Sequence, residues 1–333
     1  MGWRRTRGRL VPLVVALLAV VTASACGAAA SVGTSDDDGV ELSPVAADPT
    51  PALPAEVRSA DGSTVTVTDA SRILPLWGNL SEIVFALGLG DRVVGRDVSA
   101  TFPGTEDLPV VTRAHDVSTE SVLSLEPTVV LAQTDTGPPE ALDQIRAAGI
   151  PVVVLDMPSS VDDITPRIRT VAEALGVPDA GEDLVERTVQ EIDDVRRAIP
   201  EGSEPRVAFL YLRGQAGVYL LGGEGSGADS MIAAAGGEDA GTAIGLDRPF
   251  TPITSEAMVE AAPDVILLTG SGLESVGGID ELLAMPGIAQ TPAAASRRVV
   301  TVEDGILYSF GSRTPIALAE LIDAIHGDGT EAS

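Results

Sequence analysis

The sequence has 333 residues, of which 44% are hydrophobic and only 3% are aromatic, enough apolar material for one large or two medium-sized domains. Its 49 acidic and 21 basic side chains leave a net charge of −28, and every basic side chain is an arginine. A surface of this charge repels nucleic acid and anionic lipid headgroups, so binding to either is excluded as the main task.

The amino terminus has the pattern of an export signal. Four arginines in the first nine residues precede an apolar run over residues 11–25, and small residues lead up to Cys26, the only cysteine. The run is too short for a comfortable membrane-spanning helix. We expect residues 1–25 to be a lipoprotein signal peptide and Cys26 to carry the lipid. Ordinary cleavage near Ala25, which would leave a free thiol, is the alternative.

The next segment, residues 26–56, is small, acidic and rich in proline. It has too little apolar bulk to pack, so we expect a disordered tether between a lipid anchor and a folded body. The body then begins near residue 57.

The body repeats one pattern. Residues 118–132 and 254–269 can be superimposed at an offset of 136, which aligns a glutamate and a proline in each. Each predicts a short helix that starts at Ser or Thr, ends before the proline and leads into a β-branched strand. Residues 79–95 and 227–245 form a second pair, each predicting a helix, a glycine stop and a new strand. Asn79 and Glu82 fit a capping box at the first of these helices.

Short buried strands alternating with helices predict parallel α/β sheets, and two such halves predict two similar lobes. Between them, residues 158–200 have helical apolar spacing, interrupted near residues 176–181. We expect an N-terminal lobe over residues 57–157, a long backbone helix over 158–200 and a C-terminal lobe over 201–328. A ligand is expected in the cleft between the lobes.

Several segments of the body resemble a known group of receptors. The resemblance is to the helical-backbone (class III) periplasmic binding proteins of ABC importers, and within them to the haem-binding lipoproteins of actinobacterial haem importers. It rests on TRAHDVSTESVLSLEPTVVLA, TGPPEALDQIRAAGIPVVVL, VAFLYLRGQAGVYLLGGEGSGADSMI, GLESVGGIDELLAMPGIAQTPAA and SFGSRTP.

The resemblance implies a receptor rather than an enzyme. It implies a lipid-anchored protein on the outer face of the cell membrane that captures haem and passes it to an ABC permease and its ATPase. The residues agree, because the sequence has no GxSxG, HExxH or P-loop motif and no cysteine–histidine metal set.

Imidazole nitrogen and phenolate oxygen are the axial ligands that suit ferric haem iron. His115 follows a predicted strand near residues 110–111 and precedes a predicted helix start at Ser118. In parallel sheets ligands bind at that edge. The resembling importers place a haem-ligating histidine in this loop, which implies that role for His115. His326, near the end of the last predicted helix, is expected to be structural or solvated.

The partner ligand is expected in the second lobe. The stretch YLRG follows the strand predicted over residues 206–210, and the resembling proteins use a tyrosine there with an arginine two residues later. This maps to Tyr211 and Arg213, whose guanidinium would favour the phenolate form of the tyrosine. Tyr219 is expected in the core or the cleft wall, and Tyr308 is a weaker alternative ligand.

Two further groups of residues have expected roles. Arg113 and Arg96 are candidate contacts for the haem propionates, with a plain surface role as the alternative. In the resembling class one glutamate near a helix start in each lobe contacts the permease, which maps to Glu82 and, as a substitute, Asp229. A simple acid at a helix N-terminus is the alternative for both.

Other ligands and classes stay open. A receptor of the same fold for a ferric siderophore or for cobalamin is the first alternative, although siderophore sites present several arginines and aromatics and this chain has ten aromatics in all. An exported α/β enzyme and a structural surface protein are the others.

Overall fold

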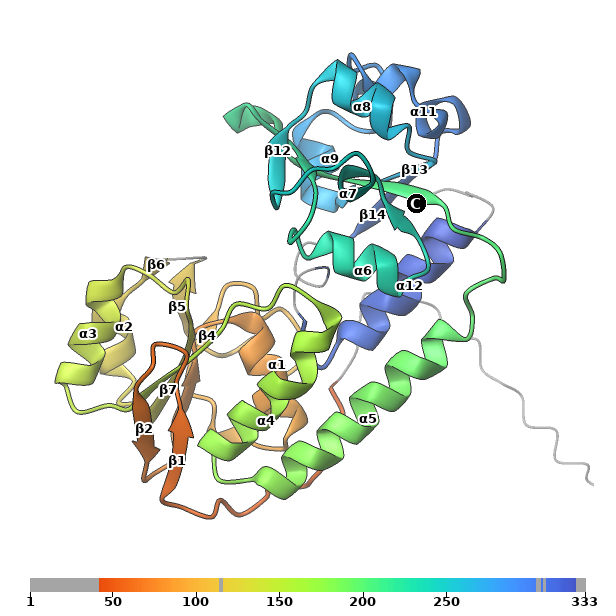
Figure 1. The fold of residues 1–333 in the computed structure, drawn as a ribbon. Helices are drawn as coiled ribbons and strands as arrows, with labels where there is room; N and C mark the ends of the chain where they lie inside the picture. The colour runs from red at the N-terminus through yellow and green to blue at the C-terminus, as the bar shows by residue number, and fades with distance from the viewer. Residues whose placement is uncertain (1–41, 114–115, 304–306, 308–309, 328–333) are drawn as a thin grey trace, which may run out of the picture. The chain divides into compact units, whose positions relative to one another are not determined.

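The first half of the chain is built on small sheets of short strands. The computed structural model describes residues 42–113, 116–303, 307 and 310–327, and among these the first half forms a hairpin and two three-stranded sheets (Figure 1). The hairpin pairs β1 (Ala55–Arg58) with β2 (Thr64–Val67). The parallel sheet has the order β3 (Ile73–Pro75), β7 (Val129–Gln133), β8 (Val152–Leu155). The other sheet has the order β4 (Arg96–Asp97), β5 (Val110–Arg113), β6 (Asp116–Val117), with β4 and β5 parallel and β5 and β6 antiparallel.

The helices of this half cover the parallel sheet on both faces. They are α1 (Gly78–Ala86), α2 (Thr119–Ser124), α3 (Pro139–Ala147) and the 3-10 turns η1 (Gly90–Arg92) and η2 (Val161–Asp163). Along β7, Val129 and Leu131 pack into a core that includes α1, whereas Val130 and Ala132 pack into a core that includes α2 and α3. Successive side chains of a strand point to opposite faces, so a strand buried on both faces is apolar throughout.

The second half of the described chain forms a larger, mixed sheet. Its strands are β9 (Arg206–Arg213), β10 (Val218–Gly222), β11 (Glu238–Asp239), β12 (Phe250–Pro252), β13 (Val265–Thr269) and β14 (Val299–Val302), in the order β12-β10-β9-β13-β14 with β11 also on β9. Strands β9, β13, β14 and β11 pair in parallel, whereas β10 is antiparallel to both β9 and β12. The antiparallel pair arises because only η3 (Gly214–Ala216) and Gly217, at φ 68°, separate β9 from β10, too short a link for a parallel crossover.

Helices cover this sheet on both faces as well. They are α6 (Ala228–Ala234), α7 (Ala240–Ala243), α8 (Ser255–Ala261), α9 (Gly270–Ser275), α10 (Ile279–Leu283), η4 (Ile288–Gln290), α11 (Pro292–Ser296) and α12 (Thr314–His326). One face of β9 and β13 packs with α6 and α12, and the other packs with α8, α10 and α11. The α/β class with parallel-rich sheets is therefore confirmed. In the part of the chain that the structure describes, no helix combines the length and the apolar character that crossing a membrane requires.

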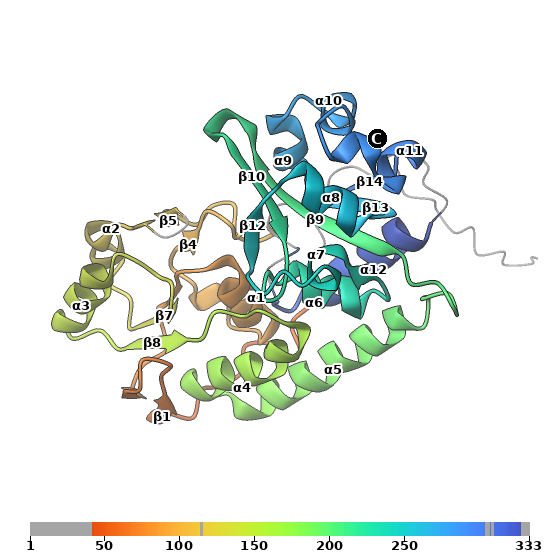
Figure 2. The same ribbon diagram turned by 45° about the horizontal axis from the view of Figure 1, so that its top comes forward.

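The helical segment between the two halves contains two helices. They are α4 (Ile164–Ala174) and α5 (Pro178–Arg196), which pack side by side in both views (Figures 1 and 2). The interruption expected near residues 176–181 lies at Gly176, whose φ is +72°. A side chain at Gly176 would approach the carbonyl oxygen of Ala52 to 2.8 Å, so glycine is required there. Helix α5 also packs against α12.

The predicted helix-to-strand repeat is present in both halves. Ser118 caps α2 by accepting a hydrogen bond from the N–H of Ser121, and Thr254 caps α8 by accepting one from the N–H of Ala257. Each unit then turns through a left-handed residue before its proline, with φ 46° in the first unit and 41° in the second. The helices lead into β7 and β13, which are buried along their whole lengths.

The capping box expected at Asn79 and Glu82 is wrong. Helix α1 begins after Trp77, and no side chain caps it. Asn79 instead accepts a hydrogen bond from Gln133 at the end of β7, at 2.8 Å. Glu82 faces inward and is engaged by a residue far along the chain, so tertiary partners displace the local motif.

That distant partner of Glu82 is Arg313, the residue before α12. The guanidinium donates to Oε1 of Glu82 from Nε at 2.9 Å, and Nη2 lies 2.8 Å from the same oxygen. The two side chains are only 1% and 4% exposed, and Arg313 also lies over the ring of Phe102 at 5.4 Å. Gly311 passes so close to the Glu82 carboxylate that a side chain there would collide with it. This ion pair joins α1 of the first half to the start of α12.

Removing one member of this pair should destabilise the fold strongly. Glu82→Ala leaves the Arg313 guanidinium buried and uncompensated, which costs about 3–5 kcal/mol of unfolding free energy. Urea unfolding monitored by circular dichroism measures the change.

Two variants complete that comparison. Glu82→Ala combined with Arg313→Met removes both charges and should recover much of the loss. Glu120→Ala, at an exposed position of α2, should change stability by less than about 0.5 kcal/mol. A loss below about 1 kcal/mol for Glu82→Ala would show that the pair does not stabilise the fold.

Candidate functional site

The carboxyl end of β9 holds the two residues expected to form the second-lobe half of the site. Tyr211 and Arg213 are two residues apart on one strand, so their side chains share a face. The guanidinium carbon of Arg213 lies 4.7 Å from the centroid of the Tyr211 ring, and Nη1 of Arg213 donates to the carbonyl oxygen of Leu212 at 2.9 Å. Both residues are partly exposed, so the stacked ring and guanidinium lie at the margin of the core near the end of the strand.

A phenylalanine from another strand completes the surroundings of this tyrosine. The ring of Phe250 on β12 lies 5.7 Å from that of Tyr211, tilted by 56°. Sequence reasoning missed Phe250 because its position beside β9 depends on β10 pairing between the two strands. The other expected aromatic, Tyr219, is partly buried on β10, where it pairs with Leu212.

The expected histidine ligand, His115, lies outside the described residues, as does Tyr308. The residues that flank His115 are described. Arg113 at the end of β5 pairs with Asp116 at the start of β6, and both are exposed. The helix start predicted after this loop is confirmed, with Ser118 as the N-cap of α2.

The two candidate propionate contacts have different surroundings. Arg113 is exposed on β5. Arg96 is partly buried, and its Nη1 donates to the carbonyl oxygens of Ala100 at 3.0 Å and Asp97 at 3.4 Å. Arg96 therefore holds the loop that follows β4, whereas Arg113 has the accessible guanidinium.

The two acids expected at a permease contact are both engaged within the chain. Glu82 is 1% exposed and paired with Arg313. Asp229 is partly buried and accepts a hydrogen bond from the N–H of Gly225 at 2.8 Å, which holds the glycine-rich turn before α6. The expected lipid attachment residue, Cys26, lies outside the described residues.

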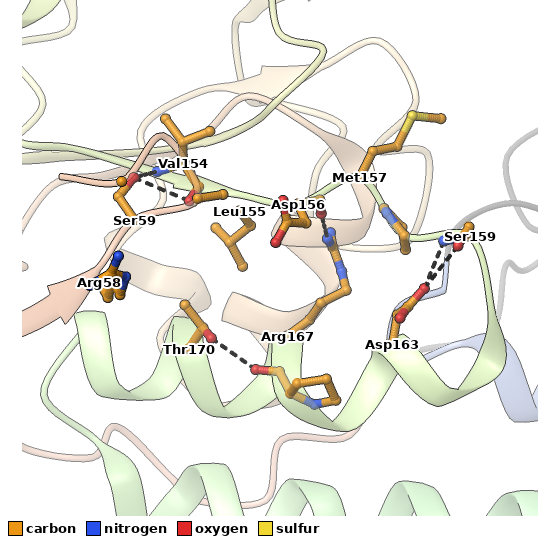
Figure 3. A pocket seen from close by; sticks show the side chains of 14 residues that line it. Arg58, Ser59, Val154, Leu155, Asp156, Met157, Ser159, Asp163, Arg167 and Thr170 are labelled. Carbon is orange, nitrogen blue, oxygen red and sulfur yellow. Dashed lines mark hydrogen bonds between the residues drawn. The ribbon is translucent and has the colours of Figure 1, made fainter. Parts of the chain in front are cut away.

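A cavity of about 510 Å³ lies at the carboxyl end of β8, beside the β1–β2 hairpin and α4 (Figure 3). Sequence reasoning missed it, although Asp156 and Met157, directly after a buried strand, mark this edge. Arg167 on its wall is 5% exposed and donates from Nη1 to the carbonyl oxygen of Asp156. Burial lowers the pKa of Arg167 to about 10, although the negative charges of Asp163, Asp135 and Asp156 act to raise it.

This cavity offers no open anion site. Nε and Nη2 of Arg167 have no hydrogen-bond partner among the described residues, but both atoms are themselves inaccessible. The carboxylate of Asp163 is likewise already hydrogen-bonded within the chain. Burial disfavours its charge, but N–H bonds from Ser159 and Ser160, at 2.8 and 2.9 Å, outweigh that and lower its pKa. Among the described residues, no group of three or more His, Cys, Asp or Glu side chains is placed to hold a metal ion.

Comparison with known proteins gives consistent matches. Residues 78–304 match the sequence pattern of the family described as periplasmic binding protein. The crystal structure of the heme-binding protein HmuT is 38% identical with a TM-score of 0.79, covering 87% of this chain and 96% of that one. The periplasmic heme-binding protein RhuT from Roseiflexus sp. RS-1, in apo form, is 43% identical with a TM-score of 0.72, covering 77% of this chain and 100% of that one.

Curated relatives are more distant. An uncharacterized ABC transporter substrate-binding lipoprotein of Bacillus subtilis, YvrC, is 26% identical over 94% of this chain and 95% of its own length. A vitamin B12-binding protein of Yersinia pestis is also 26% identical, over 62% of this chain and 72% of its own length.

Proposed function

This chain belongs to the periplasmic binding protein family and is a substrate-binding protein of an ABC importer, and we propose that its substrate is haem. Such proteins bind and release a ligand without transforming it. The observation that carries the proposal is the partly exposed Tyr211 with the guanidinium of Arg213 stacked on its ring. Phenolate oxygen is a ligand for ferric haem iron, and an adjacent cation favours that ionised form.

The solved structures support this assignment. HmuT and RhuT are both named as heme-binding, and their identities of 38% and 43% extend over most of this chain. Three further structures of HmuT are of variants in which a histidine, a tyrosine and the arginine two residues after that tyrosine are replaced. Tyr211 and Arg213 have the same spacing here, and His115 precedes them in the same order.

We propose His115 as the axial ligand from the first half of the chain and Tyr211 as the ligand from the second. Iron bonds to residues of both halves would stabilise the arrangement in which the two ligands are close enough to share one iron. The propionates need cationic partners near water. Arg113, which is exposed, fits that need better than Arg96, which is committed to backbone carbonyls.

The second candidate substrate is cobalamin, favoured by the similarity to vitamin B12-binding proteins, with a ferric siderophore as a further possibility within the same fold. Haem is preferred because the solved structures that cover more of this chain, at higher identity, are of heme-binding proteins.

For the permease contact we propose Glu120 and Glu256 in place of Glu82 and Asp229. Both are exposed acids in the first turns of α2 and α8, the equivalent helices of the two repeats. Large apolar side chains are exposed at equivalent positions three residues later, with Leu123 36% and Val259 53% exposed. A matching acidic and apolar patch on each half suits a permease with two similar arginine-bearing surfaces.

We also propose that Cys26 carries a lipid and that residues 26–41 form a tether, so that the body works on the outer face of the cell membrane. The name of YvrC as a lipoprotein is consistent with this. The rest of the expected tether packs on the body, since the N–H groups of Val45 and Ala52 donate to the carbonyl oxygens of Ala86 and Gly176, both at 2.8 Å. A chain held at the membrane meets its permease at a high effective concentration.

Hemin titration of the detergent-solubilised protein tests the substrate. An equimolar amount should produce a new Soret band relative to a detergent blank, whereas cyanocobalamin should neither bind in calorimetry nor displace hemin. His115→Ala and Tyr211→Ala should each change the spectrum. Arg213→Ala should lower hemin affinity by about 10- to 100-fold, as removing a partner of a metal ligand does.

The matched control for that titration is Tyr219→Phe on the adjacent strand, which should leave the spectrum unchanged. Absence of a Soret band for the unaltered protein would refute haem as the substrate. Unchanged spectra for both His115→Ala and Tyr211→Ala would place the iron elsewhere.

Charge reversal tests the permease contact. Glu120→Arg and Glu256→Arg together should abolish hemin uptake into proteoliposomes containing the permease and its ATPase, with hemin affinity within twofold of the unaltered protein. Glu140→Arg, an exposed acid in the first turn of α3, is the control and should retain uptake. Normal uptake by the double variant would exclude this surface.

Cell fractionation tests the anchor. Cys26→Ala expressed in the native host should move from the membrane fraction to the medium, because lipid attachment requires that thiol. Mass spectrometry of the membrane form should find a lipid-modified amino-terminal cysteine. Retention of the variant in the membrane would exclude Cys26 as the attachment residue.

A further inference from the structure

Three aromatic rings gather beside the carboxyl half of β9. The whole chain has five phenylalanines, three tyrosines and two tryptophans, so aromatic residues are scarce and three neighbouring rings are not expected by chance. Phe250 contacts Tyr211 at a centroid distance of 5.7 Å and Phe209 at 6.4 Å. These separations lie within the range at which aromatic side chains attract one another. Phe209 is fully buried, whereas Phe250 and Tyr211 are partly exposed, so the cluster leads from the core to the surface.

The sheet order explains how a ring on β12 reaches β9. Strand β10 lies between them, and its residue opposite Phe250 is Gly222. A side chain at Gly222 would approach the ring of Phe209 to 3.1 Å. Because glycine leaves that space open, the ring of Phe250 crosses the intervening strand and packs on the rings of β9, in the way that aromatic residues cover glycines in sheets.

Two residues therefore contact the ring of Tyr211. Arg213, on its own strand, lies 4.7 Å from the ring centroid, and Phe250, two strands away, lies 5.7 Å from it. The ring of a partly exposed tyrosine at a strand end would otherwise turn among rotamers. Packing against Phe250 restricts the direction of its phenolic oxygen.

We propose that Phe250 is a positioning residue for Tyr211, holding the phenol in the orientation in which its oxygen meets ferric haem iron. This inference rests on the proposed haem-binding function and adds to it a residue on another strand. Ligand groups must be held by packing partners to bind a metal at full affinity, so the effect of Phe250 should pass through the Tyr211 oxygen.

A double-mutant cycle with hemin separates this role from simple packing. In the unaltered background, Phe250→Ala should weaken hemin binding by about tenfold and shift the tyrosinate-to-iron charge-transfer band. In the Tyr211→Phe background, which keeps the ring but removes the oxygen, Phe250→Ala should change hemin affinity by less than about twofold. Phe250→Tyr, which keeps the ring, should retain the band.

The control is Phe85→Ala on α1. It removes a partly exposed ring that packs edge-on against Phe102, with the ring centroids 5.1 Å apart. It should lower the melting temperature without moving the charge-transfer band. Equal losses of affinity from Phe250→Ala in both backgrounds would overturn the positioning role while leaving haem as the substrate. A protein without any Soret band would overturn the proposed function and this inference together.

Discussion

The buried pairing of Glu82 with Arg313 is the interaction on which the arrangement of the chain depends. Both charged side chains are less than 5% exposed, so their removal from water costs free energy. Pairing and hydrogen bonds between the charges offset that cost. Arg313 is paired with the Glu82 carboxylate through Nε and lies over the face of Phe102, whereas its Nη2 makes no hydrogen bond among the described residues. Because Arg313 precedes α12, and α12 packs on α5 and α6, the pair fixes the last helix to the first one. Helix α1 contacts β3 and β4, and α12 contacts β14, so the pair connects elements that pack on the sheets of both halves.

Regular features of the fold were accessible from the sequence. The repeated helix-to-strand unit was predicted because its caps, prolines and β-branched runs are local signals, and the structure contains both copies. The antiparallel β10 was not predicted, although Gly214 and Gly217 mark the short turn that forces it. The capping box at Asn79 failed for a different reason, since Gln133 and Arg313 lie 54 and 231 residues from their partners. Contacts at such separations leave no periodic signal in a single sequence.

The candidate site also contains some residues that the sequence predicted and others that it could not. Tyr211 and Arg213 were predicted from the resemblance of YLRG to the known receptors, and their stacking is explained by their spacing of two on one strand. Phe250 was not found because it reaches Tyr211 only through a sheet order that the sequence does not reveal. His115 and Cys26 remain predictions of motif and resemblance. Burial separates Glu82 from the exposed acids Glu120 and Glu256, because an acid at a helix start gives no sign in sequence of whether it faces solvent.

Gly222 has a consequence for how this protein tolerates mutation. Its contribution to the Tyr211 cluster is empty space, and the nearby ring of Phe209 leaves only 3.1 Å for a first side-chain atom. Alanine or serine there would look conservative by size and polarity, yet its first side-chain atom would crowd the ring of Phe209 and the hydroxyl of Ser226, so a neighbour would have to shift. The tolerance of a position to substitution therefore depends on the space around it. A glycine without a side chain can limit the geometry of a binding site through that space.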